Sequence, residues 1–240
     1  MTTPVCLHSG RYDAAIVDLD GTMVDTLGDF VAALRLMLAD VLPRELAGAA
    51  LDSATVACRV GKGSEHLVKS VLNHVFAQYR SAYSAIDSGA IYGQAQASYQ
   101  RHYAVINGQH STIYPGVLEG LDHLQKSGVK LVCLTNKPLA FARSLLRLKE
   151  LDCFFCEVFG GDSFERKKPD PLPLRKACEF LGTPPARTLV IGDSSNDALA
   201  ARAAGCPVLL VTYGYNHGEP VRSVDADGFM DSLAELAEQC

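Results

Sequence analysis

The sequence predicts an α/β protein in which a doubly wound parallel sheet is interrupted by one all-helical insertion. Short apolar runs recur along the chain and alternate with segments whose apolar residues follow helical spacing. This alternation is typical of parallel strands connected by helices that cover both faces of the sheet. Between residues 26 and 110, however, no run resembles a strand. We therefore predict a core formed by residues 1–25 and 111–240, and a helical cap formed by residues 26–110.

The composition limits the partners of the chain. Its 240 residues carry a net charge of −5 with a pI near 5.8, which argues against binding to nucleic acid or to an anionic membrane. No apolar run approaches the roughly 18 residues of a membrane span, and the N-terminus lacks the pattern of a secretory signal. The eight cysteines are scattered, as expected of reduced thiols. We expect a cytoplasmic protein, either a monomer or a homodimer.

The first predicted strand ends in a group of carboxylates. Residues 14–17 (AAIV) form a run too short for a helix and too apolar for an exposed edge, which predicts a central strand. Asp18, Asp20 and Asp25 follow this strand. Carboxylates that crowd together repel one another, so the group needs a cation or a proton. Ligands of open α/β sheets bind at the carboxyl ends of the strands, and we expect the functional site here.

The segment that follows predicts helices only. Apolar residues at helical spacing run from 30 to 41 and from 67 to 76, and tyrosines at 79, 83, 92, 99 and 103 mark further helix up to about Ile106. Between the first two patterns, residues 56–60 lead to a turn with glycine at 61 and 63. This turn could close over the site as a lid.

From residue 113 onward, strands and helices alternate. We predict strands at 130–134, 154–159, 188–191 and 208–211. The helices between them are predicted from apolar stripes at 117–124, 141–148 and 174–180, from the alanine-rich segment that ends at Gly205, and from Leu233 and Leu236 near the C-terminus. The whole pattern is that of a doubly wound, Rossmann-like sheet.

Three of these strands end in polar signatures. They are DLDGT (18–22), LTNK (134–137) and IGDSSND (191–197), and the loop KKPDP (167–171) lies between the last two. Because the carboxyl ends of parallel strands lie at the same edge of a sheet, the signatures should build one site.

In this order, DLDGTMVDT, LTNKP, KKPDP and IGDSSND resemble the four motifs of the haloacid-dehalogenase superfamily of phosphohydrolases. The helical segment lies where that superfamily places its cap. Within the superfamily, YPGV (114–117), TNKP (135–138), GGD (160–162) and VTYGYNHGE (211–219) are similar to the bacterial phosphoglycolate phosphatases. The resemblance covers nearly the whole chain and is looser across 40–110. It implies a Mg²⁺-dependent phosphomonoester hydrolase that acts through an aspartyl-phosphate on a small anionic ester, 2-phosphoglycolate above all.

The resemblance also implies roles for the acidic residues. Asp18 and Asp193 would hold Mg²⁺ by their side chains and Asp20 by its backbone carbonyl, since Mg²⁺ prefers oxygen ligands. Asp18 would be the nucleophile. Asp20 would protonate the leaving alkoxide and later deprotonate the attacking water.

The remaining motif residues would serve the phosphoryl group. Thr135 would donate a hydrogen bond from its hydroxyl with help from the Asn136 backbone, and Lys168 would offset the charge of the phosphoryl oxygens. Thr135 could also cap the helix that begins at 138. Asp197 would hold Lys168 or a metal-bound water, or serve only as a first-turn helix charge. Lys137 is as readily a surface lysine as a phosphate neighbour.

The cap gives an indication of the substrate. It carries slightly more Lys and Arg than Asp and Glu, whereas the core is acidic. Arg59, Lys62 and His66 surround the glycine turn. We predict that Arg59 and Lys62 recognise the carboxylate of a small phosphate ester; a solvated loop between two helices is the alternative.

Other functions remain open. A phosphatase for a sugar phosphate or N-acetylmuramate 6-phosphate would carry the same four motifs, and so would a β-phosphoglucomutase. A phospho-aspartate signalling receiver also combines an accepting aspartate with threonine and lysine partners. A receiver has no second aspartate two residues later to hydrolyse the ester, so Asp20 favours an enzyme.

Overall fold

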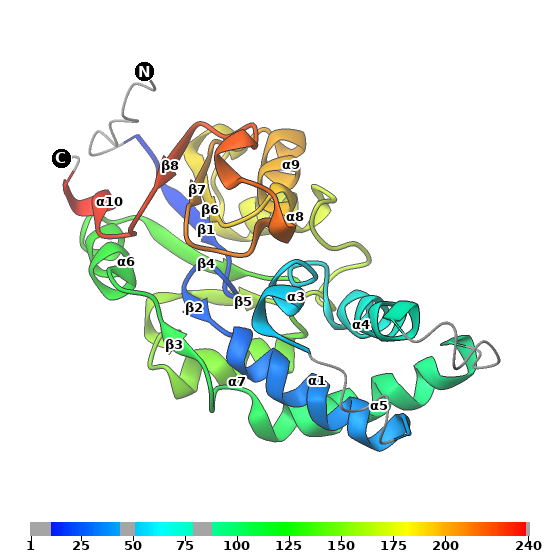
Figure 1. The fold of residues 1–240 in the computed structure, drawn as a ribbon. Coiled ribbons are helices and arrows are strands. Elements are labelled where there is room, and N and C mark those ends of the chain that lie inside the picture. Colours follow the sequence, from blue (N-terminus) through cyan, green and yellow to red (C-terminus); the bar gives the residue numbers. More distant parts are fainter. Residues whose placement is uncertain (1–10, 44–50, 79–87, 239–240) are drawn as a thin grey trace.

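The computed structural model describes residues 11–43, 51–78 and 88–238. Six parallel strands form the main sheet in the order β5-β4-β1-β6-β7-β8 (Figure 1). The strands are β1 Ala14–Val17, β4 Lys130–Leu134, β5 Glu157–Phe159, β6 Thr188–Gly192, β7 Val208–Val211 and β8 Gly228–Met230. The strand order reverses at β1, since β4 and β5 lie on one side of it and β6 to β8 on the other. The predicted doubly wound sheet is therefore confirmed.

Strand β1 lies at the centre of the sheet and is covered on both faces. Ala15 and Val17 belong to a buried cluster with α6 (Val117–Lys126), α7 (Leu139–Leu148) and the residues around α10 (Glu235–Glu238). Ala14 and Ile16 belong to a second cluster, with α8 (Leu172–Leu181) and α9 (Ser195–Ala204). Successive side chains of a strand point to opposite faces. A strand between two helical layers must therefore be apolar at every position, as AAIV is.

Four helices of the described residues form a separate body beside the sheet (Figure 1). They are α1 Leu27–Val41, α3 Ser53–Ala57, α4 Ser64–Gln78 and α5 Ser88–Ile106. These helices share a buried cluster of their own, distinct from the two clusters that flank the sheet. Within the described residues, the expectation of helices alone in this segment is confirmed. Tyr79 and Tyr83 of the predicted helix lie outside the described residues.

The chain leaves and re-enters the sheet side by side. Strands β2 (Val24–Asp25) and β3 (Thr112–Ile113) form an antiparallel pair at this crossing. Next to it, the buried carboxylate of Asp29 accepts hydrogen bonds from the backbone N–H groups of Gly108 and His110, each at 2.7 Å. The crossing lies where the boundaries between cap and core were placed. The separate helical cluster supports that division, which stays a prediction.

Parts of the core differ from the prediction. The strand expected from residue 154 begins only at Glu157, because Asp152–Phe154 forms a 3-10 helix (η1) that packs Phe154 against the cluster around α6. Strand β8 was not predicted, since three residues beginning with glycine make no recognisable apolar run. Three further 3-10 helices are η2 Pro185–Arg187, η3 Asn216–Gly218 and η4 Val221–Ser223. None of the helices described has the length and apolar character needed to cross a bilayer.

Candidate active site

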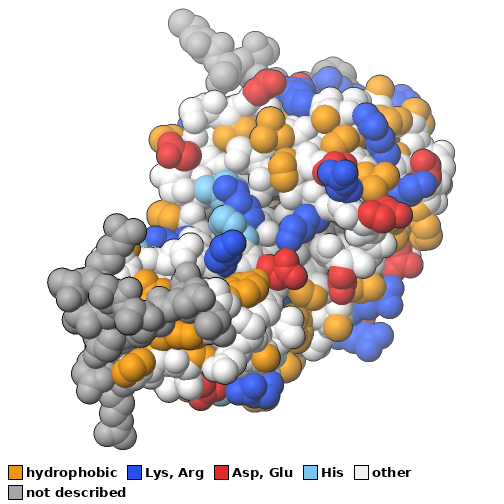
Figure 2. Space-filling view, turned by 90° about the vertical axis from the view of Figure 1, so that its right-hand side faces the viewer, with side chains coloured by type: hydrophobic (Ala, Val, Ile, Leu, Met, Phe, Trp, Pro, Cys, Tyr) orange, Lys and Arg blue, Asp and Glu red, His pale blue; other side chains and the backbone are white. Residues whose placement is uncertain are grey.

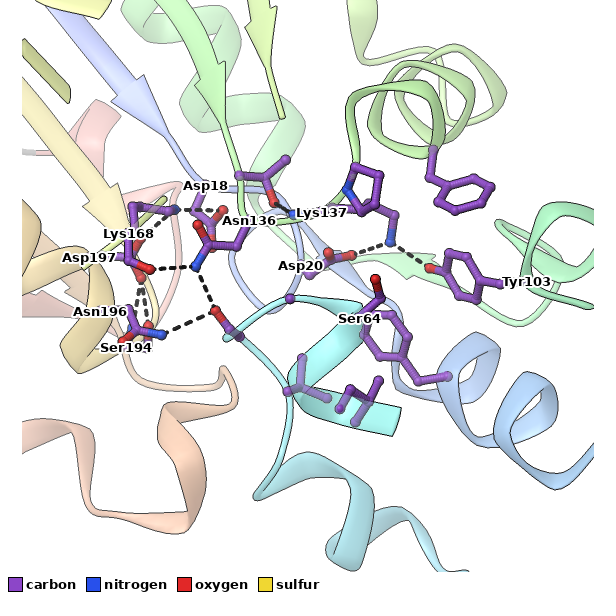
Figure 3. Close-up of a pocket in the computed structure, with 18 of the residues that line it drawn as sticks. Asp18, Asp20, Ser64, Tyr103, Asn136, Lys137, Lys168, Ser194, Asn196 and Asp197 are labelled. Atoms are coloured by element: carbon purple, nitrogen blue, oxygen red, sulfur yellow. Dashed lines mark hydrogen bonds and ion pairs between the residues drawn. The ribbon is translucent and has the colours of Figure 1, made fainter. Parts of the chain in front are cut away.

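The carboxyl ends of the central strands meet the cap at one cavity (Figure 3). Asp18 follows β1, Thr135 follows β4 and Asp193 follows β6. The residues around the cavity that were predicted as site residues are Asp18, Asp20, Thr135, Asn136, Lys168 and Asp197. Asp193 does not line the cavity but lies next to it, with a carboxylate oxygen within 4.8 Å of oxygens of Asp18 and Asp197. The structure thus brings all seven core residues of the predicted site together.

The turn after β1 has glycine at the point of closest approach to Asp193. Gly21 has a φ of 85°, a conformation that side-chain-bearing residues rarely adopt. A Cβ atom on Gly21 would lie 2.2 Å from Oδ2 of Asp193, so no other residue fits without displacing that carboxylate. The Asp193 oxygen also accepts a hydrogen bond from the Tyr215 backbone N–H at 2.7 Å. The glycine of DLDGT therefore lets Asp193 approach the loop that carries Asp18 and Asp20.

Lys168 is the central cation of the site. Its Nζ lies 2.9 Å from Oδ1 of Asp18 and 2.6 Å from Oδ1 of Asp197, and it donates to the Leu134 carbonyl at 2.9 Å. The side chain is 4% exposed. Burial disfavours the charged form of Lys168, but the two carboxylates outweigh burial and raise its pKa. Lys168 is therefore a fixed positive charge beside Asp18.

The carboxylates outnumber this lysine. Burial raises the pKa of Asp193 well above its usual range, and the charges of Asp197 and Asp18 add to the shift. Burial also raises the pKa of Asp18 to about 6, although Lys168 opposes the rise. Crowded oxygens with excess negative charge suit a hard divalent cation. The oxygens of Asp197 are occupied by Lys168 and Ser194, which leaves Asp18 and Asp193 as side chains that could hold a metal ion.

Asp197 contacts both Lys168 and the first turn of its own helix, α9. One carboxylate oxygen accepts from Lys168, and the other accepts from the Ser194 backbone N–H at 3.2 Å and the Ser194 hydroxyl at 2.8 Å. The contacts with Ser194 form a capping box at the start of α9. Both roles considered for Asp197 from the sequence are therefore compatible with its contacts: it orients Lys168 and stabilises the first turn of α9.

Thr135 and Asn136 both lie at the cavity wall. Thr135 does not cap α7, because the first N–H of that helix, from Leu139, donates to Oδ1 of Asp162 at 2.8 Å. The Thr135 hydroxyl oxygen accepts from the Lys137 backbone N–H at 3.2 Å. Nδ2 of Asn136 donates to the Lys168 carbonyl at 2.8 Å, which fixes the loop that carries the lysine.

The glycine turn of the cap is tied to the core. The Gly61 carbonyl accepts from Nδ2 of Asn136 at 2.9 Å and from Nδ2 of Asn196 at 3.1 Å (Figure 3). Gly61 and Gly63 line the cavity with φ values of 100° and 88°. Two core asparagines therefore hold the turn over the cavity. Asn196 was missed from the sequence, although it lies within the IGDSSND signature.

Arg59 and Lys62 do not line the cavity. The Arg59 guanidinium bonds to the Thr55 carbonyl and, at 3.1 Å, to Nδ1 of His74, both within the cap. Lys62 is exposed between the two glycines of the turn. Recognition of a carboxylate by these two residues therefore stays a prediction.

Basic side chains gather on the outer surface near this turn. Figure 2 shows a face of the molecule on which histidines lie beside Lys and Arg side chains. Burial lowers the pKa of His66 and of His217, and nearby Lys62 lowers both further. A Cβ atom on Gly61 would lie 2.9 Å from the His217 ring, so this group lies directly behind the cavity wall. The positive charge at this surface comes from the lysines rather than the histidines, and it attracts anions toward the site.

Lys137 is buried, so its interpretation as a surface lysine is wrong. Its side chain is 2% exposed and its Nζ lies 2.8 Å from Oδ1 of Asp20. The position directly after Thr135 and Asn136 was the only sequence signal for it. Its burial depends on aromatic residues of the cap that are distant in the sequence, Phe30 and Tyr103.

Comparisons with known proteins agree with this geometry. The sequence profile of the haloacid dehalogenase-like hydrolases matches residues 12–205. The chain is 42% identical over 224 residues to a phosphoglycolate phosphatase of Thiobacillus denitrificans, which covers 93% of each chain. It is 43% identical over 223 residues to a plasmid-encoded phosphoglycolate phosphatase of Cupriavidus necator, which covers 93% of this chain and 90% of the other.

A solved structure is similar over nearly the same length. The crystal structure of a predicted phosphoglycolate phosphatase from Haemophilus somnus 129PT superposes with a TM-score of 0.86 at 29% identity. It covers 95% of this chain and 97% of its own. The similarity therefore includes the helical cap as well as the sheet.

Proposed function

The chain belongs to the haloacid dehalogenase-like hydrolases, and we propose that it is a Mg²⁺-dependent phosphatase that converts 2-phosphoglycolate to glycolate and phosphate. The observation that carries this proposal is the convergence of Asp18, Asp20, Thr135 and Lys168 on one cavity. The choice of substrate is supported by relatives more than 40% identical over 93% of the chain, each named a phosphoglycolate phosphatase.

Attack by Asp18 begins the proposed reaction. A carboxylate oxygen of Asp18 forms a bond to phosphorus while the bond from phosphorus to the ester oxygen breaks, which gives an aspartyl-phosphate and an alkoxide. Lys168 lies 2.9 Å from Asp18 and offsets the negative charge of the phosphoryl oxygens as the group transfers. Thr135 lines the same wall and donates a hydrogen bond from its hydroxyl to one of these oxygens.

Asp20 acts as the general acid in the first step and as the general base in the second. It gives a proton to the alkoxide as glycolate leaves. It then takes a proton from the water that attacks phosphorus, and the bond between phosphorus and the Asp18 oxygen breaks to release phosphate. Because Asp20 is placed two residues after Asp18 and lines the same cavity, one side chain can serve the leaving group and the water in turn.

The acidic cluster fits a Mg²⁺ ion. Asp18 and Asp193 would hold the ion by their side chains, and the resemblance to the family implies that Asp20 would add its backbone carbonyl. Bound there, Mg²⁺ supplies the positive charge that allows a carboxylate to approach a phosphate dianion.

The test is phosphate release from 2-phosphoglycolate with Mg²⁺ and with EDTA. We expect release with Mg²⁺ and none above background with EDTA. The matched control is Asp18→Asn, which keeps the shape of the side chain and removes the nucleophilic charge. We expect this variant to fold and to release no phosphate. Release that continues in Asp18→Asn would contradict the role of Asp18.

A panel of esters separates the alternatives that share these motifs. We expect kcat/KM for 2-phosphoglycolate to exceed the values for N-acetylmuramate 6-phosphate and for sugar phosphates. Conversion of β-glucose 1-phosphate to glucose 6-phosphate without phosphate release would instead identify a mutase. Equal values for all esters would contradict the proposed substrate and leave a general phosphatase.

A further inference from the structure

A second polar cluster lies at the cap end of the cavity. Nζ of Lys137 lies 2.8 Å from Oδ1 of Asp20 and donates to the Tyr103 hydroxyl at 2.5 Å (Figure 3). The ammonium also lies 4.9 Å from the ring centre of Phe30 and 4.8 Å from that of Tyr103. The cap thus provides an aromatic enclosure for a core lysine that is almost fully buried.

Within the part of the chain that the structure describes, three hydrogen-bond donors of this cluster have no acceptor. An ammonium has three N–H groups, and two of those of Lys137 are taken up by Asp20 and Tyr103. Burial, and then the charge of Asp20, raise the pKa of Tyr103 well above its usual range, so its hydroxyl keeps a proton to donate. Ser64 lines the same cavity, and its hydroxyl points toward Lys137 and Tyr103 in Figure 3.

Lys137 and Tyr103 are buried and Ser64 is partly buried. Buried donors without acceptors are unfavourable, and three donors that face one space indicate a place for an anion. Ser64 is also the first residue of α4, whose N-terminal end carries a partial positive charge. Lys137 and Lys168 are the two lysines around the cavity. Lys168 is taken up by Asp18, Asp197 and a backbone carbonyl. Of the two lysines that line the cavity, Lys137 therefore has an N–H group left for a ligand at the cap end.

We propose that Lys137, Tyr103 and Ser64 form the binding site for a carboxylate on the alcohol portion of the substrate. This inference rests on the proposed function, which assigns Asp20 to the ester oxygen. In a phosphorylated 2-hydroxy acid, one carbon atom separates the ester oxygen from the carboxyl carbon. Lys137 lies in contact with Asp20, so an ester oxygen held at Asp20 puts the carboxylate next to the Lys137 ammonium.

The aromatic wall behind the cluster limits the length of the substrate. Tyr103 packs against Phe30 with ring centres 5.5 Å apart and against Phe141 at 5.2 Å. All three rings line the cavity. The cluster therefore selects short esters, in which the carboxylate follows the ester oxygen after a single carbon. Under this proposal, the cluster recognises the carboxylate instead of Arg59 and Lys62, which do not line the cavity.

The test compares 2-phosphoglycolate with ethyl phosphate, which has the same two-carbon skeleton and a methyl group in place of the carboxylate. The readout is the ratio of the two kcat/KM values in wild type and in Lys137→Met. Loss of a buried charged hydrogen bond should lower this ratio by about 10- to 100-fold. Any effect of Lys137 on Asp20 as a proton donor acts on both esters and leaves the ratio unchanged. Tyr103→Phe, which keeps the ring, should lower the ratio by about 2- to 10-fold.

Two comparison variants and a binding measurement sharpen the result. Lys137→Arg keeps the charge, so its ratio of kcat/KM values should be closer to that of wild type than the ratio of Lys137→Met. Lys62→Met should have the same ratio as wild type. Glycolate should inhibit the hydrolysis of ethyl phosphate, with an inhibition constant about 10-fold higher in Lys137→Met than in wild type. Should Lys137→Met fail to fold, Lys137→Arg and Tyr103→Phe still measure the same ratio.

The outcomes distinguish this inference from the function on which it rests. A wild type that hydrolyses neither ester overturns the proposed function and the carboxylate site together. A wild type that prefers 2-phosphoglycolate, with a preference that Lys137→Met leaves intact, overturns the carboxylate site alone. A preference that is lost in Lys62→Met and kept in Lys137→Met places the carboxylate at the glycine turn. This result also overturns the carboxylate site proposed at Lys137.

Discussion

Replacement of Lys168 by methionine tests how the buried charges of the site are balanced. Methionine has a similar length and removes the ammonium that contacts Asp18 at 2.9 Å and Asp197 at 2.6 Å. The carboxylates of Asp18, Asp193 and Asp197 would then be buried together, with no other ion-pair partner among the described residues. Removal of one partner of a buried ion pair costs about 3–5 kcal/mol. We expect the free energy of unfolding of the metal-free protein to fall by this amount.

The corresponding change in melting temperature is large enough to measure. The entropy of unfolding is about 2.1 cal/mol/K per residue, or roughly 0.5 kcal/mol/K for a chain of this length. The loss therefore lowers Tm by about 6–10 °C in EDTA. Calorimetry with an excess of EDTA measures this shift, and the same scan with Mg²⁺ should recover part of it, because metal binding to the folded state restores positive charge.

A second substitution shows whether charge is the cause. Asp197→Asn removes one of the three carboxylates and keeps an oxygen that can accept from Ser194, so it preserves the capping contact at α9. The variant that combines Lys168→Met with Asp197→Asn should melt at a higher temperature than Lys168→Met alone. An unchanged Tm in Lys168→Met, or a double variant that melts lower still, would refute the charge-balance argument.

Three other predictions follow from contacts at the site. Gly21→Ala puts a Cβ atom 2.2 Å from the Asp193 carboxylate and should weaken Mg²⁺ binding measured by titration calorimetry, whereas Gly182→Ala, also at positive φ but with open space around it, should not. Asn196→Ala removes one of the two hydrogen bonds to the Gly61 carbonyl. A hydrogen bond contributes about 1 kcal/mol, so KM should rise about fivefold. An unchanged KM contradicts a role for Asn196 in holding the glycine turn over the cavity. Mg²⁺ added to metal-free wild type should raise Tm, and Asp193→Asn should abolish the rise.

The main features of the site could be predicted from the sequence because they depend on local patterns. An apolar strand that ends at Asp18 fixes where that carboxylate lies, and a second such strand fixes Asp193. The sheet then brings both ends together, since neighbouring parallel strands share an edge. The same local rule places Thr135 at the end of β4.

Contacts between distant segments could not be predicted in this way. The burial of Lys137 depends on Phe30 and Tyr103, which α1 and α5 bring to it from the cap. Arg59 lies beside the glycine turn in the sequence, yet the Thr55 carbonyl of α3 and the ring of His74 take up its guanidinium. Position near a flexible turn indicates which charges could face a ligand, and packing decides which of them do.

The measurement that tests the central claim most directly is the location of the phosphoryl group during turnover. Enzyme mixed with 2-phosphoglycolate and Mg²⁺, quenched in acid within one turnover and digested, should carry one phosphoryl group on the peptide that contains Asp18. Asp20→Asn should slow both the appearance and the loss of this group, because Asp20 serves the leaving alkoxide and then the attacking water. A phosphoryl group on another residue, or none in either protein, would contradict the account.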